Sequence, residues 1–509
     1  MSVCLNRKFG LYLSVITISV VLSIWMIHID GVINNDGVHY ILTAEYIAEG
    51  MWADALQTFK WPAYSFLIYL AQLLPFTDFE IAAHIVTTVG FTFSAVLFLL
   101  VVDALGADWR TICLAALVVL SFPGINEFRA FLIRDSIFLA FYLGAIWFLI
   151  SYTRNKSLAP LCWSALMIGL AALFRVEALV LMCIYPLLVI GRLNSSVWRI
   201  VLALVYIVIG VKFLSMFYGW WMYRPEGHLD PWALIHQPTE LMQRTWSQLS
   251  DSLSIRFLEL QQDRAGWLAS SGAGLTIMSQ IITIVVSESI RTLTIPIALI
   301  LLWALFKPSL LDDIPTSARR KLTVLIIVQM IILLVFAASK FFLASRYPLS
   351  LCITLLVLVP FILNALINKL SPYWGRFRRH SLFGFLGLLL VVNSVEGLDR
   401  FSSKHFITEA GSWFQQGTPA RGRLITNSTQ FSYYSGRYGE LGILLPDADE
   451  FAEFIREGQW RYKDYIVAQL SHKNHSLANL LQSSLDQEPI REFFNKKGDR
   501  VVIYYTADD

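Results

Sequence analysis

The sequence predicts an all-α polytopic membrane bundle of about eleven transmembrane helices with outer juxtamembrane helices, followed by a small C-terminal α/β domain. Two observations lead to this prediction. Apolar residues make up 56% of the 509-residue chain and charged residues only 15%, whereas a soluble domain usually carries about 25% charged residues. Apolar runs of roughly twenty residues, the length that crosses a bilayer, recur along most of the chain.

The candidate spans are read directly from these apolar runs. They lie near residues 9–29, 81–102, 109–123, 134–152, 158–173, 176–191, 197–221, 288–306, 320–342, 346–367 and 380–397. Basic residues gather in short loops, beginning with Arg7 and Lys8 before the first span. Because such loops tend to stay in the cytoplasm, we expect a cytoplasmic N-terminus and outer loops at 30–80 and 222–287.

The segment 61–76 is apolar but too short for a full crossing. Counting it as a span would place the later basic loops on the wrong side. We therefore predict an outer juxtamembrane helix there, and a transmembrane domain that covers residues 1–397.

Residues 398–509 have an ordinary soluble composition. Alternating apolar and polar residues predict strands in this region, and apolar residues at helical spacing predict helices. The expected strands are 423–427, 464–470, 490–495 and 499–506, and the expected helices are 448–458 and 476–485. We predict a small α/β domain on the outer side of the membrane.

The first outer loop contains the candidate catalytic residue, Asp36. It follows the first span directly, and Gly37 permits a tight turn after it. A carboxylate at the boundary between membrane and water can act as a general base towards an acceptor hydroxyl or amine. It can also cap the helix that starts here, and the two roles are compatible. His39 and Tyr40, one helical turn further on, are candidate substrate-binding residues.

Several basic residues are predicted on the outer face, against the positive-inside tendency. Guanidinium and ammonium groups there suit a phosphate or pyrophosphate, although basic side chains at helix ends also snorkel to the interface. Asp135 beside Arg134 forms either an interfacial ion pair or part of a site, and Arg175 with Glu177 reads as a short outer turn. The candidate substrate-binding residues of these segments are Arg129, Arg134, Asp135, Lys340, Arg346 and Tyr347.

The long outer loop contains the aromatic segment GWWMYRPEGHLDPW, in which Arg224 and His228 are candidate substrate-binding residues. Its aromatic residues form either an interface belt or stacking platforms for a sugar. His228 with Glu226 and Asp230 has the ligand types of a metal site, but no spaced partner set accompanies them. We therefore assign no metal ligand.

Other function classes are excluded or weakened by what the sequence lacks. A net charge of +3 is too small to indicate nucleic-acid binding. The Walker-type phosphate-binding motif, the HExxH zinc motif and the GxSxG motif do not occur. An ATP-driven pump and the commonest zinc protease and serine hydrolase types are therefore not expected.

The segments DGVHYILTAEYIAEG, WPAYSFLIYL, FLIRDSIFLAFYLGAIWF, AALFRVEALVL and ASRYPLSLCITLL, in this order, resemble the GT-C superfamily of integral membrane glycosyltransferases. The nearest resemblance is to the bacterial protein O-mannosyltransferase and aminoarabinose transferase type. It implies an inverting transferase that takes a sugar from a polyprenyl-phosphate-linked donor. The acceptor would be a lipid, glycan or protein on the periplasmic face of the inner membrane, and no cofactor is required beyond a possible divalent metal.

The resemblance also implies roles for individual residues. Asp36 lies at the position of the catalytic acid of the superfamily, so it would be the general base, and Asp135 matches a second acidic position. Lys340 and Arg346 lie where basic residues would hold the donor phosphate. Many relatives have a second acid after the first, but Gly37 stands there in this chain, which argues against a paired-carboxylate mechanism.

Two other functions remain open from the sequence. A transporter or flippase of lipid-linked sugars would have paired halves with broken helices, and we find no such internal symmetry. An O-antigen ligase or polymerase would have a large periplasmic loop, with which the loop 222–287 is compatible.

Overall fold

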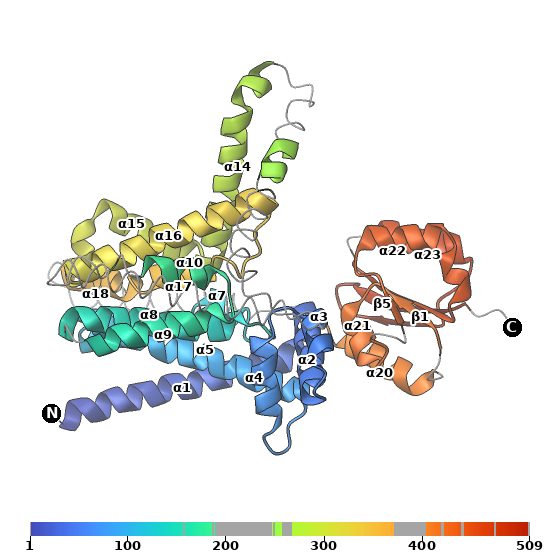
Figure 1. Ribbon diagram of the computed structural model, residues 1–509, viewed down its shortest axis with the longest axis horizontal. Coiled ribbons are helices and arrows are strands. Elements are labelled where there is room, and N and C mark those ends of the chain that lie inside the picture. Colours follow the sequence, from blue (N-terminus) through green and yellow to red (C-terminus); the bar gives the residue numbers. More distant parts are fainter. Residues whose placement is uncertain are drawn as a thin grey trace, which may run out of the picture.

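The computed structural model describes residues 2–155, 158–185, 188, 247, 250–256, 267–370, 404–418, 422–438, 442–472 and 475–506. A long bundle of helices is joined at one end to a smaller α/β domain, which lies beside α2 and α3 (Figure 1). The predicted boundary at residue 397 falls outside the described residues and stays a prediction.

The first half of the bundle consists of long apolar helices and shorter helices between them. The long helices are α1 (Ser2–Asp30), α5 (Phe79–Ala104) and α8 (Asp135–Asn155), with α6 (Trp109–Leu120) and α9 (Leu158–Ala172) beside them. The short ones are α2 (Asn35–Ala48), α3 (Trp52–Thr58), α4 (Ala63–Gln72), α7 (Pro123–Asn126) and α10 (Glu177–Ile184). Asp78 and Asp108 cap α5 and α6 by accepting a backbone N–H from the first turn.

The second half of the bundle has one sharp bend. Its helices are α14 (Trp267–Leu293), α15 (Ile295–Phe306), α16 (Thr316–Lys340), α17 (Leu349–Leu356) and α18 (Val359–Leu370), with the 3₁₀ turn Pro308–Leu311 after α15. The predicted span 288–306 is not one straight helix, because α14 and α15 meet there at an angle of 111°. The break is at Thr294, which has a φ of +69°, two residues before Pro296. Proline clashes with the preceding turn of a helix and lacks the N–H that would continue it.

Among the described residues, five helices are long and apolar enough to cross a membrane, or six if the bent pair counts as one span. The predicted spans 109–123 and 158–173 correspond to helices shorter than 18 residues. The predicted spans 197–221 and 380–397 lie outside the described residues, so the count of eleven stays a prediction. The segment 61–76 contains α4, a helix of ten residues, as expected of a juxtamembrane helix.

α5 and α8 pack closely where Gly90 lies against Ser136. A Cβ atom added at Gly90 would be 2.8 Å from the backbone carbonyl carbon of Ser136. We expect Gly90→Ala to lower the free energy of unfolding by about 1–3 kcal/mol through overpacking, measured by thermal unfolding in detergent. The matched control is Gly169→Ala in α9, where no atom lies within 4 Å of the added carbon. Equal effects of the two substitutions would contradict this account.

The C-terminal domain is a five-stranded sheet between two layers of helices (Figure 1). The strands are β1 (Leu424–Thr426), β2 (Gly442–Leu444), β3 (Tyr465–Leu470), β4 (Arg491–Phe494) and β5 (Arg500–Tyr505), in the order β2-β1-β3-β5-β4. β1 pairs in parallel with β2 and β3, and β5 pairs antiparallel with β3 and β4. The helices are α20 (His405–Gly417), α21 (Thr429–Tyr434), α22 (Ala448–Arg456) and α23 (His475–Leu485), with the 3₁₀ turn Gln459–Tyr462.

All six segments predicted for this domain are confirmed as strands or helices. Neighbouring residues of β1 face opposite layers, with Ile425 in the core beneath α22 and α23 and Leu424 in the core with α20 and α21. The sequence interpretation did not include α20, α21 or β2. α21 and β2 have only six and three residues, which is too short for a period of apolar residues to be recognised.

The C-terminal domain contacts the start of α2 directly. The Tyr434 hydroxyl accepts a hydrogen bond from the Ile33 backbone N–H at 3.1 Å, and the Gln430 amide donates to the Ile33 carbonyl at 2.6 Å. The Tyr438 hydroxyl lies 3.2 Å from Nδ1 of His39. These contacts join the domain to the loop that leads into α2, the helix whose first turn contains Asp36.

Candidate active site

Asp36 lies in the first turn of α2 and forms an ion pair with Arg346, which lies between α16 and α17. Nη1 of Arg346 donates to Oδ2 of Asp36. The N-cap of α2 is Asn34, so Asp36 is not the cap and its carboxylate faces another part of the chain. Both side chains remain partly exposed, at 41% for Asp36 and 30% for Arg346, and a substrate can therefore reach them.

Asn34 holds α2 against the segment that leads into α8. Its side-chain amide donates to the Leu132 carbonyl at 3.2 Å, and its oxygen accepts the Leu132 N–H at 2.8 Å. Gly37 allows this approach, since a Cβ there would lie 3.0 Å from Cβ of Leu132. A second acid at position 37 would not fit without a shift of the backbone, which agrees with the single carboxylate at this turn.

A second group of charges consists of Arg175 and Asp135, which are almost fully buried, and Glu177, whose side chain is 21% exposed. The Arg175 guanidinium donates from Nη1 to Asp135, and from Nε and Nη2 to Glu177. The exposed fraction is 7% for the Arg175 side chain and 4% for Asp135. Charges are stable at such a depth only when paired and hydrogen-bonded, so this triad is a rigid unit.

The two groups of charges are coupled through Arg346. Burial alone would lower the pKa of its guanidinium, but the carboxylates of Asp135 and Asp36 outweigh burial and raise it. The ring of Tyr347 contacts an arginine of each group. Its centre lies 5.0 Å from the guanidinium carbon of Arg175 and 5.8 Å from that of Arg346. The arrangement therefore holds a cation beside a partly exposed carboxylate.

Aromatic rings form the wall next to Asp36. Tyr40 is buried and packs edge-on against Phe59 and Tyr64, each at 4.9 Å between ring centres. Burial raises the pKa of the Tyr40 hydroxyl to about 12, so it stays protonated. Arg134 lies over the ring of Phe59 at 5.7 Å.

Other predicted substrate-binding residues occupy different surroundings. His39 faces Tyr438 of the C-terminal domain, and Lys340 is the exposed last residue of α16. Arg224 and His228 lie outside the described residues, as do Glu226 and Asp230. Within the residues that the structure describes, no cluster of three or more His, Cys, Asp or Glu side chains has the arrangement of a metal site.

Arg129 does not belong to this group of charges. It is fully buried, and its guanidinium donates to Asn126 and to Ser19 and Ser23 of α1 at 2.8–3.0 Å. These hydrogen bonds attach α1 to the turn that contains α7. We therefore leave Arg129 out of the proposed site.

Arg175 and Glu177 are site residues that sequence reasoning missed, because they were interpreted as a short turn. The sequence contains a signal: two charges separated by one residue interrupt the apolar stretch 158–191, and charges at membrane depth tend to be functional. Their partner Asp135 lies 40 positions away, and the sequence alone does not connect the two segments.

No protein-family model matches the sequence, and no curated protein matches it. Solved structures do match. ArnT from Cupriavidus metallidurans bound to undecaprenyl phosphate is 14% identical, with a TM-score of 0.55 over 97% of this chain and 98% of that chain. The oligosaccharyltransferase AglB from Archaeoglobus fulgidus, in complex with an inhibitory peptide and a dolichol-phosphate, is 11% identical, with a TM-score of 0.55 over 94% of this chain and 71% of that chain.

The apo form of the Archaeoglobus fulgidus oligosaccharyltransferase gives a similar result, with 12% identity and a TM-score of 0.56 over 92% of this chain and 71% of that chain. At such low identities the likeness shows the fold alone, and the predicted helical bundle with a small C-terminal α/β domain is confirmed at that level.

Proposed function

We propose that the protein transfers a sugar from a polyprenyl-phosphate-linked donor to an acceptor at the periplasmic face of the inner membrane, with inversion at the anomeric carbon. The observation that carries this proposal is the Asp36–Arg346 ion pair, a carboxylate and a cation held together at the end of a GT-C fold. The lipid phosphates in two structural neighbours support the class of donor.

The chemistry requires one base and one phosphate-binding cation. Asp36 accepts the proton of the acceptor hydroxyl or amine as its oxygen or nitrogen attacks the anomeric carbon of the sugar. The bond between that carbon and the phosphate oxygen breaks, and polyprenyl phosphate leaves with the electron pair. General-base catalysis contributes about 10²–10⁴-fold to such a step.

Arg346 stabilises the negative charge that develops on the leaving phosphate. Its guanidinium offers a planar fork that matches phosphate oxygens, and the carboxylates of Asp135 and Asp36 keep it protonated. The buried pairing of Arg175 with Asp135 fixes the position of that second carboxylate. The guanidinium of Arg346 therefore stabilises the transition state, in which negative charge develops on the leaving phosphate.

We expect Arg346→Gln to lower kcat/KM for the lipid-linked donor by about 10- to 100-fold, the loss of one charge-assisted hydrogen bond in the transition state. The measurement is initial-rate kinetics in detergent with varied donor. The control is Arg291→Gln, because the Arg291 side chain is 66% exposed and, among the described residues, pairs with Glu288 at 3.7 Å. A donor kcat/KM that does not change in Arg346→Gln would exclude Arg346 as the phosphate-binding residue.

The reaction class is tested by following the sugar and the lipid separately. Purified protein in proteoliposomes is supplied with a polyprenyl-phosphate-linked sugar and a membrane extract as the acceptor source. Free polyprenyl phosphate should appear together with newly glycosylated acceptor, both identified by mass spectrometry. Movement of the intact lipid-linked sugar across the bilayer, with no change in bonding, would instead establish a flippase.

A further inference from the structure

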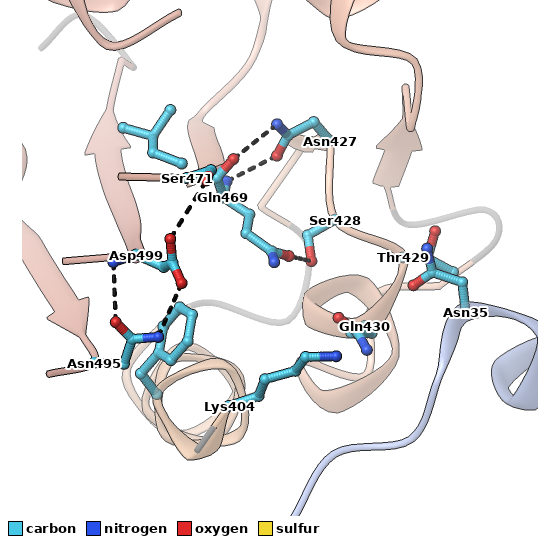
Figure 2. Close-up of a pocket in the computed structure, with 12 residues that line it drawn as sticks. Asn35, Lys404, Asn427, Ser428, Thr429, Gln430, Gln469, Ser471, Asn495 and Asp499 are labelled. Atoms are coloured by element: carbon cyan, nitrogen blue, oxygen red, sulfur yellow. Dashed lines mark hydrogen bonds between the residues drawn. The ribbon is translucent and has the colours of Figure 1, made fainter. Parts of the chain in front are cut away.

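A polar cleft lies in the C-terminal domain, at the carboxyl ends of the parallel strands β1 and β3. It has a volume of about 380 Å³, and we call it the sheet-edge cleft. Asn427 and Ser428 after β1, Gln469 in β3 and Lys404 before α20 line it, as Figure 2 shows. In open α/β sheets, ligands bind outside the carboxyl ends of the strands.

The sheet-edge cleft adjoins the start of α2, the helix whose first turn contains the proposed base. Asn35, the residue before Asp36, is part of its lining. Gln430, another lining residue, donates to the carbonyl of Ile33 at 2.6 Å. The cleft is thus attached to the chain segment that enters α2, and a molecule bound there lies next to the first turn of the helix with the catalytic carboxylate.

Amide and hydroxyl groups of the lining are already oriented by one another. Asn427 exchanges two hydrogen bonds with the backbone of Gln469, at 2.8 and 3.1 Å. The Ser428 hydroxyl donates to the Gln469 side-chain oxygen at 2.6 Å, which leaves the Gln469 amide N–H groups as donors to a ligand. Fixed amides of this kind suit a ligand that is rich in hydroxyl groups, because each hydroxyl both donates and accepts.

The sheet-edge cleft contains two charged residues, Asp499 and Lys404, which differ in whether they have a partner among the described residues. Asp499 accepts from the His472 backbone and ring and from the Asn495 amide, at 2.7–3.0 Å. Burial alone would raise the pKa of the Asp499 carboxyl, but these hydrogen bonds outweigh burial and lower it to about 2. Lys404 makes no ion pair within the described part of the chain. The positive charge is therefore the one that a ligand can neutralise.

We propose that the sheet-edge cleft binds the acceptor of the transfer reaction through an acidic, hydroxyl-rich group, a sugar that carries a carboxylate or a phosphate. This inference rests on the proposed function. In the proposed reaction the lipid-linked donor has its phosphate at Arg346. The cleft is lined mainly by residues of the α/β domain, which lies beside α2 and α3 (Figure 1). The acceptor is the remaining substrate that must approach Asp36 from that side.

Binding is measured first, because it needs no turnover. Saturation-transfer NMR on the full-length protein in detergent compares D-glucuronate, glucose 6-phosphate and D-glucose, which separate a carboxylate, a phosphate and a neutral sugar. The acidic sugars should bind about tenfold more tightly than glucose, the expected effect of one charge-assisted hydrogen bond. Lys404→Gln should remove this difference. The control Lys463→Gln, before β3 at the opposite edge of the sheet, should preserve it.

Equal binding of glucose and the acidic sugars, or unchanged binding in Lys404→Gln, would overturn the proposal. In the transfer reaction, the acidic sugar that binds should compete with the acceptor and not with the donor, and the opposite result would exclude an acceptor site. The experiments distinguish a failure of the proposed function from a failure of the proposed acceptor site. Binding retained without any transfer would contradict the proposed function, and transfer without binding would contradict the assignment of the cleft.

Discussion

Asp36→Asn is expected to abolish sugar transfer, with a fall in kcat of about 10²–10⁴-fold, the usual contribution of a general base. Asparagine has the shape of aspartate but does not accept a proton at neutral pH. The amide oxygen still accepts from Arg346, so the geometry between α2 and the turn before α17 is preserved. The measurement is single-turnover release of polyprenyl phosphate, with thermal unfolding as a check that the variant is folded.

The matched control for this prediction is Asp54→Asn. Asp54 is also an acid in the first turn of an outer helix, α3, but it is exposed and has no ion pair among the described residues. We expect its substitution to change the rate by less than about twofold, since substitutions of exposed residues without a partner usually have small effects. Substantial transfer by Asp36→Asn would show that another group takes the proton.

Arg175→Met is expected to have the largest effect on stability, a loss of about 3–5 kcal/mol. Removing one partner of a buried ion pair leaves an uncompensated charge in a medium of low dielectric constant. Here two carboxylates, Asp135 and Glu177, would lose their common partner. The prediction is tested by thermal unfolding in detergent and by the yield of folded protein.

Two further variants separate this effect from the simple loss of an arginine. Arg319→Met removes an exposed ion pair, in which Asp312 is 68% exposed, and should cost less than about 1 kcal/mol. The double variant Asp135→Asn with Arg175→Met should regain part of the lost stability, since one buried charge is then neutral. If the double variant is no more stable than Arg175→Met alone, the charge of Asp135 is not the cause.

Much of the fold can be predicted from the sequence, because a helix that crosses a membrane needs a continuous run of about twenty apolar residues. Long apolar runs predict α5, α8 and α16, and the alternating pattern after residue 422 predicts β1, β3, β4 and β5. The bend between α14 and α15 has a local signal as well, because Pro296 breaks a helix within an apolar run that is otherwise long enough to continue it.

For the candidate site, too, the sequence predicts some features and the tertiary structure is needed for the others. The sequence by itself determined that Asp36, Asp135 and Arg346 are charged residues beside a membrane, where charge is costly. Only the tertiary structure decided that Arg346 pairs with Asp36 across 310 positions, and that Arg175 lies between Asp135 and Glu177. The spacing of apolar residues describes one or two turns of a single helix, whereas these ion pairs join different helices and depend on how the helices pack. The two hydrogen bonds between Asn34 and Leu132, and the close approach that Gly37 allows, hold α2 in the position at which Asp36 reaches Arg346.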